Sequence, residues 1–392
     1  MPNAPRRVKR RASTKTPPAF SRDLKLEALA KSCTRFLGGH GVRSADELLA
    51  TIPPGTEIDY YGIGGPVTEL EAEVATLLGK QTALFLPTGT MAQQATLRVH
   101  ADRRSRRSVA FHPTCHMETN EERGYQRLHG LFGIPVGPRE EPLSMASLVQ
   151  VHEPIAALLL ELPQRALGGT LPSWTELVAQ VSWARGRGAA VHLDGARLWE
   201  ATPFYKARHR KSLADIAGLF DTVYVSFYKG LGGIAGCCVA GDTDVIEEIS
   251  VWRTRHGGRA FGLWPYAASA LSALRTRLPR MPAYSRHAFA IATAIRDVPG
   301  IELLPDPIQS PMMHLRFSVG LDEFRERALD IARSDKVWMF SRPWASLGPN
   351  LQEFELSVGD ATLELSPDEI RGLLVRLADG SGRRHTARRG RR

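Results

Sequence analysis

Short, continuous apolar runs alternate with helical stretches through the middle of this chain, between residues 83 and 240. Runs of this length, bounded by turn residues, are typical of strands that are buried on both faces of a parallel sheet. Strands are expected at residues 83–86, 109–111, 155–160, 189–193, 222–226 and 235–240. Between two of them, a helix is expected to begin after Ser173 and to end near Gly188. The alternation predicts an α/β fold in which a mostly parallel sheet is sandwiched by helices.

The regions before and after this alternation follow other patterns. Residues 26–37 and 68–78 have the apolar spacing of amphipathic helices. Capping-box sequences beginning at Ser44 and Ser366 predict the first turns of two further helices. Near the C-terminus, strands are expected at 312–318, 336–340 and 354–358, and a helix at 321–333. This last part predicts a smaller α+β domain.

Together these patterns divide the chain into six expected segments. They are a disordered basic arm at 1–20, an N-terminal helical segment at 21–58, a large α/β domain with the candidate site at 59–265, a connecting helical segment at 266–300, a small α+β domain at 301–380 and a basic tail at 381–392. We therefore expect one large and one small domain between two short tails.

The net charge of +10 comes from the two ends of the chain. Residues 1–20 contain six Lys and Arg, residues 383–392 contain six Arg, and neither stretch contains an acidic residue. The rest of the chain has 39 basic and 41 acidic residues. Such blocks of like charge are typical of solvated, disordered tails, with binding of nucleic acid through the tails as the alternative. No zinc-finger or RNA-binding motif accompanies them.

The expected location is the cytoplasm. The first twenty residues lack the apolar stretch of a secretory signal, although their Arg-rich composition leaves a transit peptide as an alternative. No apolar run approaches the roughly 18–20 residues of a membrane-spanning helix. The four cysteines have no C-x-x-C spacing, which favours a reducing compartment. Two of them, Cys237 and Cys238, are adjacent in an expected strand and should enter the core on opposite faces.

Two expected strands end in residues that carry chemistry. One strand delivers Asp194 to its carboxyl end, the edge where open α/β sheets bind ligands. The next strand delivers Lys229 into a Gly-rich turn. A partly desolvated lysine can form a Schiff base with an aldehyde, and a carboxylate can keep a pyridine nitrogen protonated. This pair indicates pyridoxal 5'-phosphate, with a surface lysine and a strand-end cap as the plain alternatives.

A phosphate site is expected at Thr88, Gly89 and Thr90, in the turn between a strand and the start of a helix, where backbone amides and the helix dipole suit an anion. The Gly-rich turn at residues 230–235 also matches the dinucleotide-binding fingerprint in its letters. That fingerprint should open a helix, whereas a strand is expected here. We interpret the glycines as room for backbone beside Lys229.

With these motifs in place, the sequence resembles the L-threonine aldolase branch of the β-eliminating lyase family, fold-type-I enzymes that use pyridoxal phosphate. The resemblance covers residues 59–265 well and the ends poorly. It is carried by Tyr61-Gly, Pro87-Thr-Gly-Thr-Met-Ala, His116 with Glu121, Asp194-Gly-Ala-Arg and Ser226-x-x-Lys-Gly-Leu-Gly, in this order. The last two motifs occur with the correct spacing, and together they are specific for this family.

The resemblance implies a role for each matching residue. Lys229 would hold the cofactor, Asp194 would pair with its ring nitrogen, and Arg197 would bind the ring hydroxyl oxygen. The phosphate would be bound by Gly89 and Thr90, with Thr88 and Ser226 nearby, and by Arg259, which lies in a basic run with Arg253 and Arg255 and would come from a partner subunit. His116 would stack on the ring and could take a proton. Its alternatives are a plain loop histidine or a metal clip with His112; no metal is expected.

The chain departs from the family where the substrate should bind. Gln164 stands where the aldolases carry a histidine, and glutamine cannot act as a general base. The arginine that binds the substrate carboxylate in the small domain is missing, since Phe354-Glu-Leu-Ser-Val stands there. Arg342 or Arg165 could replace it. Together with Tyr61, these residues form the expected substrate-binding set.

The resemblance implies a lyase that cleaves a β-hydroxy-α-amino acid to glycine and an aldehyde. A first alternative, favoured by Gln164, is β-elimination or another conversion at Cα or Cβ of an amino acid. A second is a non-catalytic relative that binds nucleic acid through its basic tails. The family also implies a homodimer or homotetramer with sites at subunit interfaces.

Overall fold

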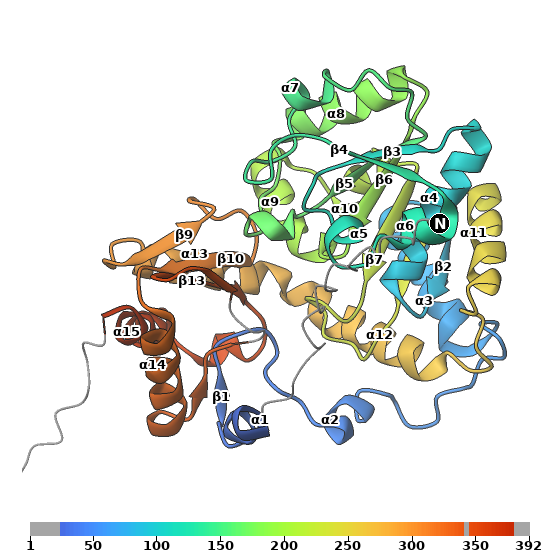
Figure 1. Ribbon diagram of the computed structural model, residues 1–392. Coiled ribbons are helices and arrows are strands. Elements are labelled where there is room, and N and C mark those ends of the chain that lie inside the picture. The colour runs from blue at the N-terminus through green and yellow to red at the C-terminus, as the bar shows by residue number, and fades with distance from the viewer. Residues whose placement is uncertain (1–23, 341–344, 380–392) are drawn as a thin grey trace, which may run out of the picture.

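The computed structural model describes residues 24–340 and 345–379. The predicted basic arm and tail, and Arg342, lie outside the described residues. Within them, the chain forms a large domain around one sheet and a small domain around another, placed side by side (Figure 1). The predicted fold class is confirmed, because the large sheet is mostly parallel and flanked by helices and the small sheet is antiparallel.

The large sheet has seven strands in the order β2-β8-β7-β6-β5-β3-β4. Their bounds are β2 (Thr82–Leu86), β3 (Ser108–Phe111), β4 (Phe132–Pro135), β5 (Ala157–Glu161), β6 (Ala190–Gly195), β7 (Thr222–Ser226) and β8 (Cys237–Gly241). Only β8 runs antiparallel to its neighbours. All six predicted strands form. The edge strand β4 was not predicted, because its Phe-Gly-Ile-Pro sequence is partly exposed and contains two residues that are unfavourable in strands.

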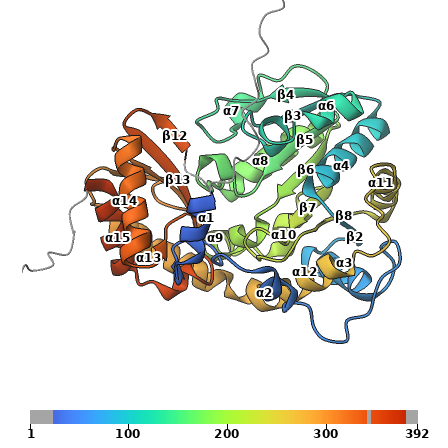
Figure 2. The ribbon, with the colours of Figure 1, turned by 60° about the horizontal axis from the view of Figure 1, so that its bottom comes forward.

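Helices cover both faces of this sheet (Figures 1 and 2). They are α3 (Gly65–Leu78), α4 (Gly89–Arg104), α5 (His116–Thr119), α6 (Gly124–His129), α7 (Met145–Leu148), α8 (Trp174–Gly186), α9 (Leu198–His209), α10 (Leu213–Gly218), α11 (Thr243–Arg255) and α12 (Trp264–Arg277). Cys237 packs with residues of α4 and α11, and Cys238 packs in the core on the other face with residues of α3 and α9. The two cysteines therefore enter opposite faces of the sheet, as predicted.

The small domain has a four-stranded sheet in the order β12-β13-β10-β9. The strands are β9 (Ile301–Leu304), β10 (Met312–Phe317), β12 (Ala345–Gly348) and β13 (Leu351–Ser357), and the helices are α13 (Met281–Ile295), α14 (Leu321–Ser334) and α15 (Pro367–Asp379). Strands β9 and β12 were not predicted. The helix α15 begins with the expected capping box, in which Ser366 and Glu369 each accept a hydrogen bond from the other's backbone amide.

The N-terminal segment belongs to both domains. The expected helix at 26–37 ends early, as α1 (Leu24–Lys31), because the chain then forms β1 (Arg35–Phe36), which pairs in parallel with β11 (Val337–Trp338) of the small domain. Tertiary pairing thus overrides the helical spacing. After β1 the chain crosses to the large domain and forms α2 (Ala45–Leu49), which has the predicted capping box at Ser44 (Figure 2).

The helix α12, the 3₁₀ turn at Leu278–Arg280 and α13 form a nearly continuous connection between the two domains. This connection corresponds to the helical segment expected at 266–300. Among the described residues, no helix is long and apolar enough to span a membrane.

Candidate active site

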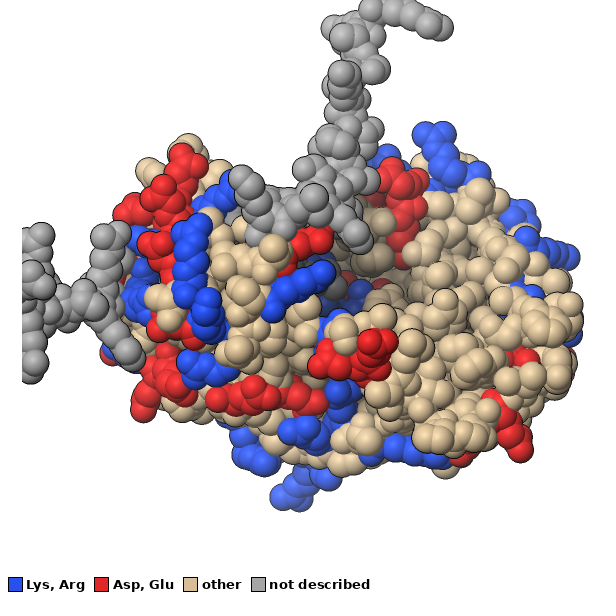
Figure 3. Space-filling view, turned by 90° about the horizontal axis from the view of Figure 1, so that it is seen from below, with Lys and Arg blue, Asp and Glu red and all other residues tan. Residues whose placement is uncertain are grey.

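The candidate site lies at the carboxyl ends of the parallel strands, where Asp194 of β6 stands in register with Glu161 of β5. One pocket at this edge contains seven of the residues singled out from the sequence, namely Gly89, Thr90, His116, Arg165, Asp194, Arg197 and Lys229. A neighbouring pocket shares Arg197 and Lys229 with it and is also lined by Glu355 of the small domain. Figure 3 shows a hollow on one face of the molecule, with charged side chains around it. Strand order explains the assembly, because parallel strands bring their carboxyl ends to a common edge.

The turn from β2 into α4 forms a cradle for an anion. Thr88 is the N-cap of α4, and its hydroxyl accepts a hydrogen bond of 3.3 Å from the amide of Met91. The first amides of a helix have no partner within the helix, so those of Gly89 and Thr90 are available to a phosphate. A Cβ at Gly89 would lie 2.2 Å from the hydroxyl of Tyr224. Glycine therefore fits here, because any side chain would collide with the hydroxyl of Tyr224.

Two carboxylates, the buried Asp194 and the partly buried Glu161, lie in register at the ends of neighbouring strands. Asp194 is 4% exposed, and its carboxylate accepts a hydrogen bond of 3.1 Å from the amide of Ala196. Burial raises the pKa of Asp194 to about 6, partly offset by that hydrogen bond. Burial, and then the charge of Asp194, raise the pKa of Glu161 to about 8. A positively charged pyridine nitrogen nearby would stabilise the ionised form of both carboxylates. This pair of carboxylates therefore fits the ring of the cofactor.

Lys229 leaves β7 through a tight turn. Its Nζ lies 4.8 Å from the centre of the Tyr228 ring. A Cβ at Gly230 would lie 2.1 Å from the carboxylate of Glu200, so only glycine fits directly after the lysine. The turn leads into strand β8 rather than into a helix, which does not fit the dinucleotide fingerprint. Glu200 itself is buried, and burial raises its pKa to about 7.

His116 is oriented by a chain of hydrogen bonds. Its Nδ1 lies 2.9 Å from Oε1 of the buried Glu121, and Nε2 of Gln94 donates 3.1 Å to the other carboxylate oxygen. A carboxylate accepts hydrogen bonds, so Nδ1 carries the proton and Nε2 is the atom able to accept one. His112 instead contacts the carbonyls of Pro138 and Glu141 through its own Nε2. Among residues 24–340 and 345–379, no three His, Cys, Asp or Glu are grouped to hold a metal.

A residue that the sequence analysis passed over joins the site from the small domain. Glu355 of β13 accepts hydrogen bonds from Arg165 Nε, at 2.6 Å, and from Arg197 Nη2, at 3.2 Å. Arg197 and Glu355 each have a side chain only 8% exposed. One signal for it was present in the sequence, namely the acidic residue in the segment where the family carries an arginine. The small domain thus contributes an anion that holds two arginines of the large domain.

Other predicted site residues lie outside this pocket. Gln164 is buried and lines a small cavity with Cys115 and His112, and this cavity shares Glu161 with the pocket. Its expected place against the substrate stays a prediction. Tyr61 is 49% exposed, and its carbonyl accepts a hydrogen bond from Arg259. Ser226 is fully buried at the end of β7.

The basic run at residues 253–259 divides in the structure. Arg253 is only 5% exposed and donates a hydrogen bond of 3.0 Å to the carbonyl of Phe85. Its expected availability to a partner subunit is therefore wrong, because it is an internal residue of its own chain. Arg255 lies over the ring of Trp252, and Arg259 is exposed.

The cradle, the strand-end carboxylate and the lysine turn suit one group with a phosphate, a basic ring nitrogen and an aldehyde. This combination, on a mostly parallel sheet with a smaller antiparallel domain, defines the fold-type-I class of pyridoxal-phosphate enzymes. The model of the family described as beta-eliminating lyase matches residues 41–318. The chain therefore belongs to the beta-eliminating lyase family, and its cofactor is pyridoxal phosphate.

Solved structures agree with this assignment. A Listeria monocytogenes protein assigned as an L-allo-threonine aldolase has a TM-score of 0.85 and 36% identity, and the match covers 91% of this chain and 99% of that one. An Exiguobacterium protein assigned as an aromatic amino acid beta-eliminating lyase or threonine aldolase has a TM-score of 0.84 and 35% identity, over 90% and 99% of the two chains.

Sequence relatives carry similar names. An aldolase of Penicillium aethiopicum is 33% identical over 223 residues, which cover 55% of this chain and 56% of that protein. Low-specificity L-threonine aldolase 1 of Arabidopsis thaliana is 27% identical over 274 residues, 67% of this chain and 75% of that protein. The match thus spans little more than half the length of the fungal relative.

Proposed function

We propose that this chain cleaves the Cα–Cβ bond of a β-hydroxy-α-amino acid, giving glycine and an aldehyde. The observation that carries this proposal is the meeting of Lys229, Asp194 and the glutamate-oriented His116 in one pocket. The names of the relatives, L-threonine and L-allo-threonine aldolases, support the same class of substrate.

When bound, pyridoxal phosphate would supply the electron sink that makes the carbon–carbon bond labile. Lys229 would hold the cofactor, the amides of Gly89 and Thr90 would bind its phosphate, and Asp194 would keep a proton on its ring nitrogen. His116 Nε2 would accept the proton of the substrate hydroxyl, because Glu121 keeps Nδ1 protonated.

The substrate carboxylate requires a cation, and we assign it to Arg165. This arginine lines the pocket and uses Nε for Glu355, which leaves its two terminal nitrogens for a bidentate contact. Arg197, bound to the same glutamate, would then face the cofactor. Arg342, the other expected candidate, lies outside the described residues.

The test is to incubate the loaded enzyme with L-threonine, L-allo-threonine, phenylserine and serine, and to identify the products. Glycine and an aldehyde in equal amounts support aldol cleavage. Ammonia and an α-keto acid would instead establish β-elimination and contradict the proposal. Salt-sensitive binding of nucleic acid without turnover would support the non-catalytic alternative.

We also propose that the site is completed by a second copy of the chain. Ile58, Tyr60, Tyr61, Ile63 and Phe261 are large apolar side chains that are all exposed, and the ring of Phe261 packs against both tyrosines. Figure 3 shows that one side of the molecule, seen from below, has a broad uncharged surface. An exposed apolar patch of this kind is typical of an interface between proteins. Arg259 lies beside it, with its guanidinium 5.9 Å from the Tyr61 ring.

In this assembly, Arg259 and Tyr61 would reach the partner's site, where Arg259 would add the cation that the neutral phosphate cradle lacks. Mixing inactive Lys229→Ala chains with inactive Arg259→Ala chains should restore activity, because one hybrid site then contains both intact residues. A fully active monomer in sedimentation would contradict the assembly. Failure to complement despite proven subunit exchange would assign Arg259 to its own site.

Two further proposals concern the domain boundaries and the cellular location. We propose the domain boundaries given above, with the change that residues 35–43 belong with the small domain through β1. A cytoplasmic location is supported by the four cysteines, which are all free and buried.

A further inference from the structure

Three consecutive carbonyls of the turn after Lys229 are each held by a basic side chain. The carbonyl of Gly230 lies 2.8 Å from His40 Nε2, that of Leu231 accepts 2.9 Å from Arg277 Nη1, and that of Gly232 accepts 2.6 Å from Arg43 Nη2. A carbonyl can only accept, so the Nε2 atom of His40 carries a proton. None of these donors belongs to β7 or β8, the two strands on either side of the Lys229 turn.

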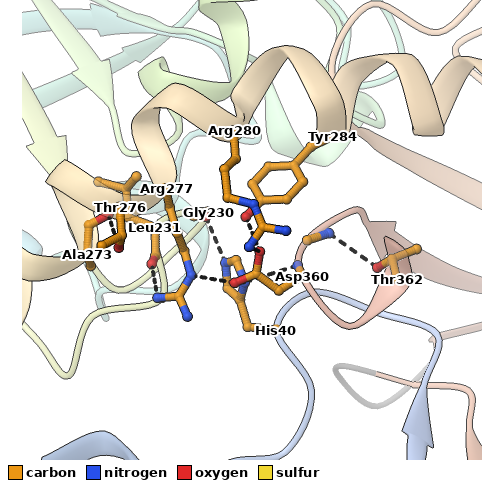
Figure 4. Close-up of polar contacts among 12 residues, drawn as sticks. His40, Gly230, Leu231, Ala273, Thr276, Arg277, Arg280, Tyr284, Asp360 and Thr362 are labelled. Carbon is orange, nitrogen blue, oxygen red and sulfur yellow. Dashed lines mark hydrogen bonds and ion pairs between the residues drawn. The ribbon is translucent and has the colours of Figure 1, made fainter. Parts of the chain in front are cut away.

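The donors are tied in turn to the small domain. Asp360, three residues after the end of β13, lies 3.4 Å from His40 Nδ1 and accepts a hydrogen bond of 2.7 Å from Arg277 Nε (Figure 4). Arg280 and the hydroxyl of Tyr284 bind its other carboxylate oxygen. Burial alone would raise the pKa of the Asp360 carboxyl, but hydrogen bonds from His40, Tyr284 and Arg277 hold it well below its ordinary value. Asp360 is therefore an anion that connects two of the three donors.

The segment that carries His40 is fixed to the small domain through the residue before it, Gly39. The amide of Gly39 donates 2.7 Å to the carbonyl of Ser357, and the carbonyl of Gly39 accepts 3.1 Å from the amide of Ala361. A Cβ on Gly359 would lie 2.5 Å from the same carbonyl, so the two backbones touch. The position of His40 is thus determined by the small domain, while its Nε2 contacts the turn of the large domain.

If His40 had only a structural role, the carbonyl that it binds could belong to any surface loop. Here the carbonyl that His40 binds belongs to the residue directly after Lys229, and the turn is too short to move without moving the lysine. The amides of Gly232 and Gly233 donate back to the carbonyls of Lys229 and Phe227, at 3.0 and 2.7 Å, so the turn moves as a unit.

We propose that His40 and Asp360 are positioning residues which hold the Lys229 turn, so that the placement of the small domain determines the placement of the lysine amine. This inference rests on the proposed role of Lys229. Nothing in it requires His40 or Asp360 to contact the cofactor or the substrate. It predicts that the two domains are coupled through backbone carbonyls rather than through the pocket itself.

The test compares two variants of His40 by amide hydrogen exchange, in cofactor-free and in loaded protein. Glutamine can place its amide nitrogen near the position of His40 Nε2, whereas the shorter asparagine cannot reach the Gly230 carbonyl. In His40→Asn, amides in residues 230–233 should exchange about tenfold faster than in the wild type, as expected for a lost hydrogen bond from a charged or polar side chain. His40→Gln should restore slow exchange, and kcat should follow the same order with KM for the amino acid little changed.

Two further variants keep the test decisive. Asp360→Asn should loosen the same turn although it lies in the small domain, and it replaces His40→Asn if that variant does not fold. Arg106→Gln is the matched control, because Arg106 also binds two loop carbonyls, those of Ile155 and Arg187, at the other end of the sheet. It should leave exchange at 230–233 unchanged.

Equal exchange at 230–233 in His40→Asn and wild type would overturn the proposal, as would the same acceleration in Arg106→Gln. Because exchange is measured without cofactor as well, the result stands apart from the proposed function. If Lys229 did not bind the cofactor, the function would fail while the exchange pattern could still be present.

Discussion

The two sides of the candidate site are built in different ways. On the large-domain side, Asp194, Lys229 and the Gly89 cradle each end or follow a strand of one sheet, so strand order alone brings them together. On the small-domain side, Glu355 and Asp360 act through arginines and a histidine that come from other parts of the chain. The first side suits a cofactor shared by many enzymes. The small-domain side is where a particular enzyme can determine which substrate it binds and how its domains are coupled.

The contrast predicts that the largest loss comes from the large-domain side. Asp194→Asn should keep the fold and the bound cofactor but lower kcat about 10²–10⁴-fold, because a neutral amide cannot keep the ring nitrogen protonated. Steady-state kinetics beside an absorbance spectrum of the bound cofactor would measure this. A variant with near-normal turnover would remove Asp194 from the mechanism and break the contrast at its strongest point.

A second prediction concerns the buried pair at the strand ends. Because burial raises the pKa of Glu161 from 4.5 to about 8, the unfolded chain releases this proton at lower pH than the folded chain does. The stability of cofactor-free protein should therefore fall as the pH rises from about 4.5 to 8. Glu161→Gln should flatten this dependence in thermal melts, whereas Glu140→Gln, at an exposed loop position, should not. Parallel curves for Glu161→Gln and wild type would be the contrary result.

On the small-domain side, Glu355→Gln should raise KM for the amino acid about tenfold while cofactor affinity stays within about twofold. The reason is that Arg165 loses the charge that orients it toward the substrate. Glu353→Gln is a matched control, since Glu353 lies on the same strand but pairs with Arg316 and His314. An equal loss of cofactor affinity in Glu355→Gln would show that the two sides are not separable.

The smallest effect is expected from the tails. A chain of residues 21–382 should turn over within about twofold of the full chain, because every pocket residue of the large domain lies in the nearly neutral body. A large loss of kcat in this shortened chain, with its fold intact by circular dichroism, would mean that a tail reaches a site.

The large-domain side could be predicted from the sequence because its determinants are local. Asp194 and Lys229 follow continuous apolar runs, and Gly89 lies between a strand and a capped helix, so each was placed at the correct edge from its own neighbours in the chain. The same local reasoning located Ser44 and Ser366 as helix caps.

The small-domain side could not be predicted in this way. The pairing of β1 with β11 joins residues about 300 positions apart, and the helical spacing of 26–37 gives no sign of it. The role of Glu355 depends on two arginines that are far away in the sequence. The role of His40 depends on a backbone carbonyl, and every residue type has one, so the sequence does not indicate this contact. The cavity that Gln164 lines could not be predicted either, because the position of a residue in a motif does not show where its side chain lies.

The most direct test of the account is to reduce the purified, cofactor-loaded enzyme with borohydride and to map the labelled peptide. The account predicts a single pyridoxyl label on Lys229, in the peptide that contains the Ser226 to Gly233 turn. A label on another lysine, or protein that takes up no chromophore after incubation with pyridoxal phosphate, would contradict it.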